Sequence, residues 1–108
     1  MKRGEVWSVA ARGTYTGKPR PAVIVQDNRF DGTASVTICV LTTDPTAAPL
    51  LRIPVAPDEL NGLDRPSQLM VDKLTTVPRA SLREQIGRLG DEDIARLDRA
   101  IIVFLGVT

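Results

Sequence analysis

An arginine between two prolines is the first residue of this sequence with a clear chemical use. Arg20 lies between Pro19 and Pro21, directly before the apolar run Ala22–Val25. Proline keeps the preceding residue extended, and the β-branched run predicts a strand buried on both faces, with Pro21 at its first position. The guanidinium would then be fixed at the mouth of a core strand. There it either binds a phosphate or forms an ordinary surface salt bridge.

Two threonines form the second candidate group. Thr42 and Thr43 follow the apolar run Val36–Leu41, and Pro45 comes shortly after them. This change from apolar to polar residues places both hydroxyls at the C-terminal end of a strand. A hydroxyl in that place can bond a phosphate or ribose oxygen, or it can simply end the strand.

Further candidates come from the basic N-terminal part of the chain. Residues 1–30 carry six basic and two acidic side chains, although the net charge of the whole chain is only +1. This segment forms either a basic face that attracts a polyanion or an ordinary solvated surface. Lys18 lies beside Arg20, and Arg29 belongs to the same basic segment. Tyr15 either stacks on a base or covers the core.

The residue types that the sequence lacks exclude several kinds of site. There is no histidine, and Cys39 is the only cysteine. Histidine-based triads and zinc sites are therefore excluded, and no glycine-rich phosphate loop is present, so we expect no metal or other cofactor. Cys39 lies within an apolar run and should be a buried thiol in a protein of the reducing cytoplasm. No apolar stretch is long enough to span a membrane.

Hydrophobic periodicity predicts six strands within a single domain of 108 residues. The strands are expected at Glu5–Val9, Ala22–Val25, Ser35–Thr42, Leu51–Val55, Ser67–Asp72 and Gln85–Leu89. The fourth should lie at a sheet edge because it contains Pro54, and a short helical turn is expected at 79–82.

The last segment changes to a helical period. Ile94, Leu97 and Ile101 recur at helical spacing after the acidic residues 91–93, and Gly106 can end the helix. Closely spaced strands followed by one amphipathic helix predict an α+β, mainly β, domain. We expect a small β-barrel with the helix laid against it.

Six short motifs occur in a recognisable order. They are Lys2–Trp7, Arg20–Val25, Val40–Thr43, Asn61–Leu63 with Ser67, Asp72–Val77 and Ile86–Leu89. In this order and spacing the chain resembles the MazF/PemK family of toxin endoribonucleases from bacterial toxin–antitoxin pairs. The resemblance implies an SH3-like barrel with a C-terminal helix, one toxin domain over residues 1–108, and a homodimer. It also implies metal-independent cleavage of single-stranded RNA and neutralisation by a small antitoxin.

The resemblance also implies roles for single residues. In the family, the arginine of the Arg-Pro motif and the threonine that ends the third strand carry the chemistry, which implies Arg20 and Thr42 here. Thr43 matches the neighbouring hydroxyl residue. Asp72 matches the acidic residue of an acid–glutamine motif, although it could instead bond backbone donors in a turn. An antitoxin with a disordered acidic tail would fold into the basic groove of the dimer.

Two departures from the family pattern affect the expected site. The loop between the first two strands is short and has no carboxylate, so a general base from that loop is missing and Asp72 or a water would replace it. Lys73 stands where many relatives have glutamine. Lysine only donates and carries a charge, so it changes the sequence preference, contacts a phosphate, or is an ordinary solvated charge.

The expected reaction uses the ribose 2′-OH as an internal nucleophile on the adjacent phosphate. Arg20 suits stabilisation of the added charge, and Thr42 can hydrogen-bond the phosphate or ribose. Two other functions stay open at this point. One is a CcdB-like poison of DNA gyrase that works through residues 101–108, and the other is a degenerate SH3-like module that binds RNA or a partner without cutting.

Overall fold

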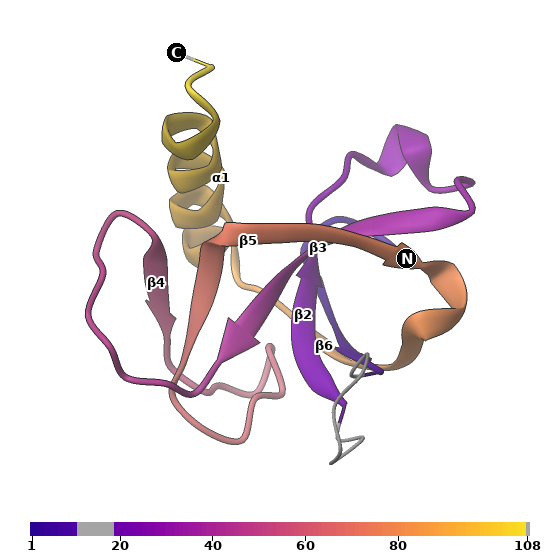
Figure 1. Cartoon of the computed structure of the whole chain (residues 1–108). Coiled ribbons are helices and arrows are strands. Elements are labelled where there is room, and N and C mark those ends of the chain that lie inside the picture. The colour runs from indigo at the N-terminus through magenta and orange to yellow at the C-terminus, as the bar shows by residue number, and fades with distance from the viewer. Residues whose placement is uncertain (11–18, 108) are drawn as a thin grey trace.

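The chain folds into a curled six-stranded sheet with one helix against it. The computed structural model describes residues 1–10 and 19–107 (Figure 1). The strands are β1 (Glu5–Val9), β2 (Arg20–Ile24), β3 (Ser35–Thr42), β4 (Arg52–Val55), β5 (Ser67–Pro78) and β6 (Leu82–Arg88). The helical elements are the short 3₁₀ turns η1 (Asn28–Phe30) and η2 (Arg79–Ser81) and the terminal helix α1 (Asp91–Leu105).

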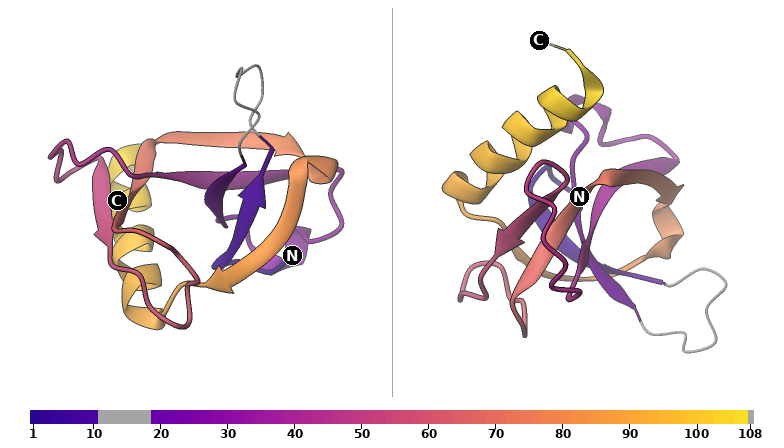
Figure 2. Two further views of the ribbon diagram at one scale, coloured as in Figure 1. Left: turned by 90° about the horizontal axis from the view of Figure 1, so that it is seen from below. Right: turned by 60° about the vertical axis from the view of Figure 1, so that its left-hand side comes forward.

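The sheet curls like a barrel but stays open. Its order is β4-β5-β3-β2-β1-β6, and every pairing is antiparallel. Figure 2 shows the strands wrapping round, with α1 packed beside β4 and β5. Within residues 1–10 and 19–107, β4 and β6 each pair with one strand only, so the ladder does not close. The prediction of a small barrel with a terminal helix is confirmed, with this open edge as a refinement.

The two central strands are buried on both faces. Ala22 and Ile24 of β2 pack with Ile38 of β3 in one core cluster. Val23 and Cys39 pack in a second cluster, to which α1 contributes. Both faces of β2 are therefore covered, which explains why this strand reads as an unbroken apolar run.

The predicted strand ends differ from the observed ones mainly after residue 72. β5 runs on past Asp72, where the predicted strand stopped. Leu41 of β3 pairs with Leu69, whereas Cys39 pairs with Leu74, so β5 has extra residues between these two pairs. The buried apolar residues before this irregularity stand at odd positions of the chain, such as Leu69 and Val71, whereas Leu74 after it stands at an even position. The alternation therefore ends in the middle of β5, and the sequence pattern misses its second half.

Two smaller features agree with the sequence. β4 is an edge strand, as Pro54 predicts. The helical turn expected at 79–82 is present as η2. Because this turn is short, β6 begins directly after it and not at the predicted Gln85.

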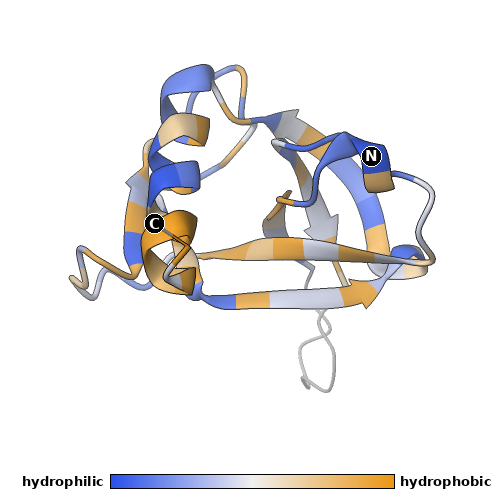
Figure 3. Cartoon of the chain, turned by 90° about the horizontal axis from the view of Figure 1, so that it is seen from above, coloured by the Kyte–Doolittle hydropathy of each residue, from blue (hydrophilic) through white to orange (hydrophobic). Residues whose placement is uncertain are grey.

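Helix α1 has one buried face and one exposed apolar end. The acidic residues 91–93 occupy its first turn, and the chain leaves it through Gly106 with a left-handed φ of 69°. Leu97 is buried, and Arg3 Nη2 lies 2.7 Å from Asp98 Oδ1, which ties the helix to the start of β1. The exposed apolar residues of its last turn are Ile102, Val103, Phe104 and Leu105 (Figure 3). No helix within the described ranges is long and apolar enough to cross a membrane.

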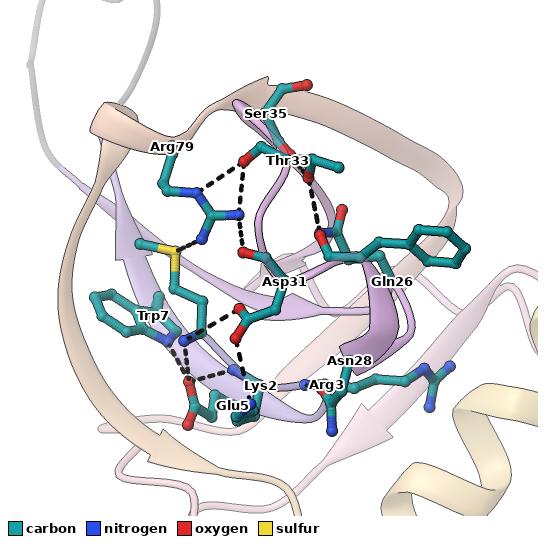
Figure 4. A network of polar contacts seen from close by, with 12 residues as sticks. Lys2, Arg3, Glu5, Trp7, Gln26, Asn28, Asp31, Thr33, Ser35 and Arg79 are labelled. Atoms are coloured by element: carbon teal, nitrogen blue, oxygen red, sulfur yellow. Dashed lines mark hydrogen bonds and ion pairs between the residues drawn. The ribbon is translucent and has the colours of Figure 1, made fainter.

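A polar network made of Lys2, Asp31, Thr33 and Arg79 joins η2 to the loop after η1 (Figure 4). Arg79 Nε donates to the carbonyl oxygen of Thr33 at 2.9 Å, and Arg79 Nη2 donates to the same oxygen at 2.7 Å. Lys2 Nζ lies 3.2 Å from Asp31 Oδ2. This hydrogen bond from Lys2 is the main reason why the pKa of the Asp31 carboxyl lies below its ordinary value. The basic groups of this Arg79 network are thus already bonded within the protein.

Candidate active-site cleft

Arg20 and Thr42 lie at the adjacent ends of the neighbouring strands β2 and β3. The two strands are antiparallel, with Ala22 opposite Val40. Continuing this register by two residues leads from Ala22 to Arg20 at the start of β2 and from Val40 to Thr42 at the end of β3. Both residues line one cleft of about 610 Å³. The arginine and the hydroxyl that the sequence singles out therefore share a site.

One wall of this cleft was missed by the sequence analysis. Besides Arg20 and Thr42, the polar lining residues are Ser8, Thr43, Asp64, Arg65 and Ser67. Thr43 was predicted, whereas the other four were not. Three of them closely follow the Asn61-Gly62 turn, which the sequence marked as a family motif but not as part of a site.

The Thr42 hydroxyl is oriented by the backbone that follows it. Its Oγ1 accepts a hydrogen bond from the Asp44 N–H at 3.1 Å. One lone pair is therefore occupied, while the hydroxyl proton is still available to a ligand. Gln68 Nε2 donates to the carbonyl oxygens of Asp44 and Thr46, both at 2.9 Å, and holds this segment in place. Thr42 is thus suited to donate to a phosphate oxygen.

Arg20 has no acidic partner among the described residues, unlike the four arginines that form ion pairs. Its side chain is exposed, and among the described residues it makes no ion pair and no side-chain hydrogen bond. Four other arginines are paired: Arg3 with Asp98, Arg29 with Asp27, Arg52 with Asp72, and Arg96 with Asp93. A planar, permanently charged group that forms no ion pair is a candidate site for an anion, although the carboxylate of Asp64 lines the same cleft.

Loop 56–66 forms the newly found wall and is built around a buried amide. Asn61 has no exposed surface. Its Nδ2 donates to the carbonyl oxygen of Ala56 at 2.9 Å, and its Oδ1 accepts from the N–H groups of Asp58 and Leu63 at 3.1 and 3.0 Å. A buried amide with these bonds fixes the loop, because breaking any of them would leave a buried polar group unsatisfied.

The other predicted site residues lie elsewhere or outside the described ranges. Asp72 Oδ1 lies 3.1 Å from Arg52 Nε, and neither residue lines the cleft. Lys73 is exposed on β5 and does not line it. Arg29 pairs with Asp27 at 3.2 Å, away from the lining residues. Lys18 and Tyr15 are also candidates, but they fall outside the described residues. A role for any of these five stays a prediction.

Cys39 takes no part in this site. It is fully buried, and burial raises the pKa of its thiol to about 12. The expectation of a buried cysteine is confirmed, and the thiol is not a nucleophile at neutral pH.

Taken together, the curled sheet, the terminal helix and the arginine–hydroxyl cleft define a small barrel protein with a candidate site for an anionic ligand. The chain belongs to the family described as PemK-like, MazF-like toxin of type II toxin–antitoxin system, which it matches over residues 2–105. The resemblance drawn from the six sequence motifs is confirmed by this match.

Relatives of known name and structure agree with the family. The chain is 57% identical over 107 residues to a probable endoribonuclease MazF from Mycolicibacterium smegmatis, covering 99% of this chain and 98% of the relative. The structure of the Mycobacterium tuberculosis toxin MazF-mt6 is similar at a TM-score of 0.76 and 26% identity, covering 92% of this chain and 93% of that one. An endoribonuclease from mycobacterial species, solved with its cognate antitoxin, shares the fold at a TM-score of 0.84 and 21% identity, covering 100% and 97%.

Proposed function

We propose that this protein is a toxin that cuts single-stranded RNA at short sequences without a metal ion. The observation that supports this most is the meeting of Arg20 and Thr42 in one cleft. The family and the name of the mycobacterial relative agree with this reaction. The substrate would place the action of the protein in the cytoplasm, with residues 1–108 acting as one toxin domain.

In the proposed reaction, the 2′-oxygen of one ribose attacks the adjacent phosphorus. The P–O5′ bond breaks, which leaves a 2′,3′-cyclic phosphate on one fragment and a 5′-OH on the other. Arg20 would bind the non-bridging oxygens and stabilise the charge of the phosphorane. Thr42 would donate to the same phosphate group, because the Asp44 N–H occupies only one of its lone pairs and leaves the hydroxyl proton free.

Asp64 is our candidate for the group that takes the proton of the 2′-OH. It is the only carboxylate among the described residues that line the cleft. Asp72, the candidate from the sequence, is held in an ion pair by Arg52. The leaving 5′-oxygen would take its proton from water. Asp64→Asn should lower kcat by roughly 10²-fold or more, whereas Glu84→Gln, an exposed change outside the cleft, should not.

Total RNA incubated with the purified protein in EDTA tests the proposal. Sequencing of the 5′-OH ends should show cuts at a short recurring motif, and Arg20→Ala should lose them without unfolding. Arg83→Ala is the matched control, because Arg83 is exposed on β6 and does not line the cleft. Inhibition of DNA gyrase by a protein that leaves RNA intact would instead support the CcdB-like alternative. Intact RNA together with intact gyrase activity would support the degenerate module.

We also propose that two copies pair through the exposed end of α1. Val103 is 59% exposed and Leu50 is 78% exposed, and both line a hollow of about 430 Å³ beside the helix. A contiguous apolar surface of this kind marks an interface, and a second copy presents the same surface about a two-fold axis. Light scattering should give the mass of a dimer, and Val103→Glu should give a monomer. A wild-type monomer at working concentration would contradict this assembly.

A cognate antitoxin with a disordered acidic tail is the partner that the cleft would accept. Arg20 and Arg65 carry no acidic partner among the described residues, so carboxylates of such a tail could compete with RNA for them. Adding an acidic peptide should inhibit cutting and raise the melting temperature. If neither changes, the tail and the RNA do not share the cleft.

A further inference from the structure

The cleft that holds Arg20 continues into a second hollow. This neighbour also has a volume of about 610 Å³, and segment 43–47 and Gln68 supply much of its lining. The two hollows have Thr43, Arg65 and Ser67 in common. Arg65 therefore stands at the border, where it can reach a ligand that extends from one hollow into the other.

The backbone of Arg65 is held firmly on both sides. Its carbonyl oxygen accepts a hydrogen bond from Ser67 Oγ at 2.9 Å, and Pro66 restricts it to an extended conformation. The preceding part of the loop packs directly on β6. A Cβ on Gly62, which has a left-handed φ of 68°, would lie 2.0 Å from the carbonyl oxygen of Ile86. The loop can approach β6 this closely only with glycine at that position.

The guanidinium of Arg65 is not used inside the protein. Arg65 is exposed, and within residues 1–10 and 19–107 it makes no ion pair. This distinguishes it from Arg52, which also lies near Gln68 but is paired with Asp72 at 3.1 Å. An arginine with a fixed backbone and no ion pair, lining the same cleft as a second such arginine, fits a ligand with two successive anionic groups.

We propose that Arg65 binds the phosphate next to the one that is cut and directs the RNA strand into the second hollow. This rests on the proposed function, because it takes Arg20 and Thr42 to mark the cut phosphate. Arg65 is then a positioning residue. It holds the strand in register across the border while Arg20 stabilises the reacting phosphorus.

Binding measured without cutting gives the first test. The probe is a short single-stranded oligonucleotide with all riboses replaced by deoxyribose, which removes the 2′-OH nucleophile. Arg65→Gln should weaken its binding roughly tenfold, the scale of one charge-assisted hydrogen bond. It should also reduce the slope of log K against log salt by about one phosphate contact. Arg83→Gln removes the same charge outside both hollows and should change neither quantity.

Neutral phosphates give the second test. The probe is an RNA oligonucleotide with the mapped cutting sequence, in which single phosphates are replaced by uncharged methylphosphonate. On the unmodified RNA, Arg65→Gln should lower kcat/KM roughly tenfold, mainly through KM. With the neutral group directly beside the cut site, on the 5′ or the 3′ side, the variant and the wild type should become equal. With the neutral group further away, the difference should persist.

The outcomes separate this inference from the proposed function. If Arg65→Gln binds the deoxyribose probe like the wild type at every salt concentration, Arg65 contacts no phosphate, even if RNA is still cut. If the effect of Arg65→Gln is the same with and without each neutral phosphate, the position assigned here is wrong. A wild-type protein that binds the probe but leaves RNA intact would overturn the proposed function and leave the binding role of Arg65 standing. Equal melting temperatures of the variants exclude unfolding as the cause.

Discussion

The two ends of the barrel use arginine in opposite ways. In the Arg79 network, the guanidinium donates to the carbonyl oxygen of Thr33, and the nearby Lys2 is paired with Asp31. In the cleft, Arg20 and Arg65 have no acidic partner among the described residues. At the first end the basic side chains bond to groups of the protein itself. At the second end they line a cleft, where they are available to a ligand.

This difference separates paired charges from unpaired ones, which a count of charges along the sequence cannot do. The basic N-terminal part of the sequence suggested one basic face, but Lys2, Arg3 and Arg29 are each paired with a carboxylate. Of the basic residues in that part that the structure describes, only Arg20 lacks such a partner. The comparison leads to four predictions in which activity and stability should respond separately.

The largest expected effect is on the rate of cutting in the cleft. Arg20→Ala should lower kcat by roughly 10²–10³-fold, the usual cost of removing one preorganised charge-stabilising donor. Its melting temperature should stay that of the wild type, because no bond within the described structure is lost. Single-turnover cleavage and thermal unfolding would measure the two quantities. A clear loss of stability would show that Arg20 has a structural partner after all.

The second effect should be on stability at the opposite end. Arg79→Ala leaves the Thr33 carbonyl without its donor and should lower the free energy of unfolding by about 2 kcal/mol. Denaturant titration would measure this, with the exposed Arg83→Ala as control. The cutting rate per folded molecule should be unchanged. If Arg79→Ala cuts more slowly while fully folded, the two ends are coupled.

A smaller effect is expected from the hydroxyl of Thr42. Thr42→Val keeps the shape of the side chain but cannot donate, so kcat should fall by roughly tenfold, the scale of one hydrogen bond to a charged group. Thr42→Ser keeps the hydroxyl and should stay close to the wild type. Equal rates for the two variants would mean that the hydroxyl does not touch the phosphate.

The smallest effect should appear in acid. The hydrogen bond from Lys2 lowers the pKa of Asp31, and the hydrogen bond from the Thr46 hydroxyl lowers that of Asp44. A carboxyl with a lower pKa in the folded state adds stability above its unfolded pKa and loses it as the pH falls through the folded value. Stability should therefore begin to fall below about pH 4. Asp31→Asn and Asp44→Asn should each reduce this loss slightly, as seen by thermal unfolding across the acid range.

The sequence was sufficient to predict the part of the site that depends on strand order. The apolar run after Pro21 and the threonines after Leu41 mark the adjacent ends of β2 and β3, and these ends meet because neighbouring strands are antiparallel. The helix was also predictable, since its period, acidic first turn and final Gly106 all agree.

Contacts between distant segments could not be predicted in this way. The Arg52–Asp72 pair forms because β4 lies beside β5, and the sequence pattern around Asp72 does not predict this pairing. The wall that carries Arg65 depends on the hydrogen bonds of Asn61 and on close packing against Ile86. An Asn-Gly turn in a sequence signals only that the chain reverses.

Pro54 has one more consequence, which concerns the outer edge of β4. Leu51 accepts from Val71 of β5, so by alternation positions 52 and 54 turn their backbones away from the sheet. The Arg52 N–H is taken by the carbonyl oxygen of Ala48 at 2.8 Å, and Pro54 has no N–H. At these two positions the outer edge of β4 therefore has no free N–H group that could pair with a further strand. Molecules crowded together in a cell are thereby hindered from joining edge to edge into fibres on this side.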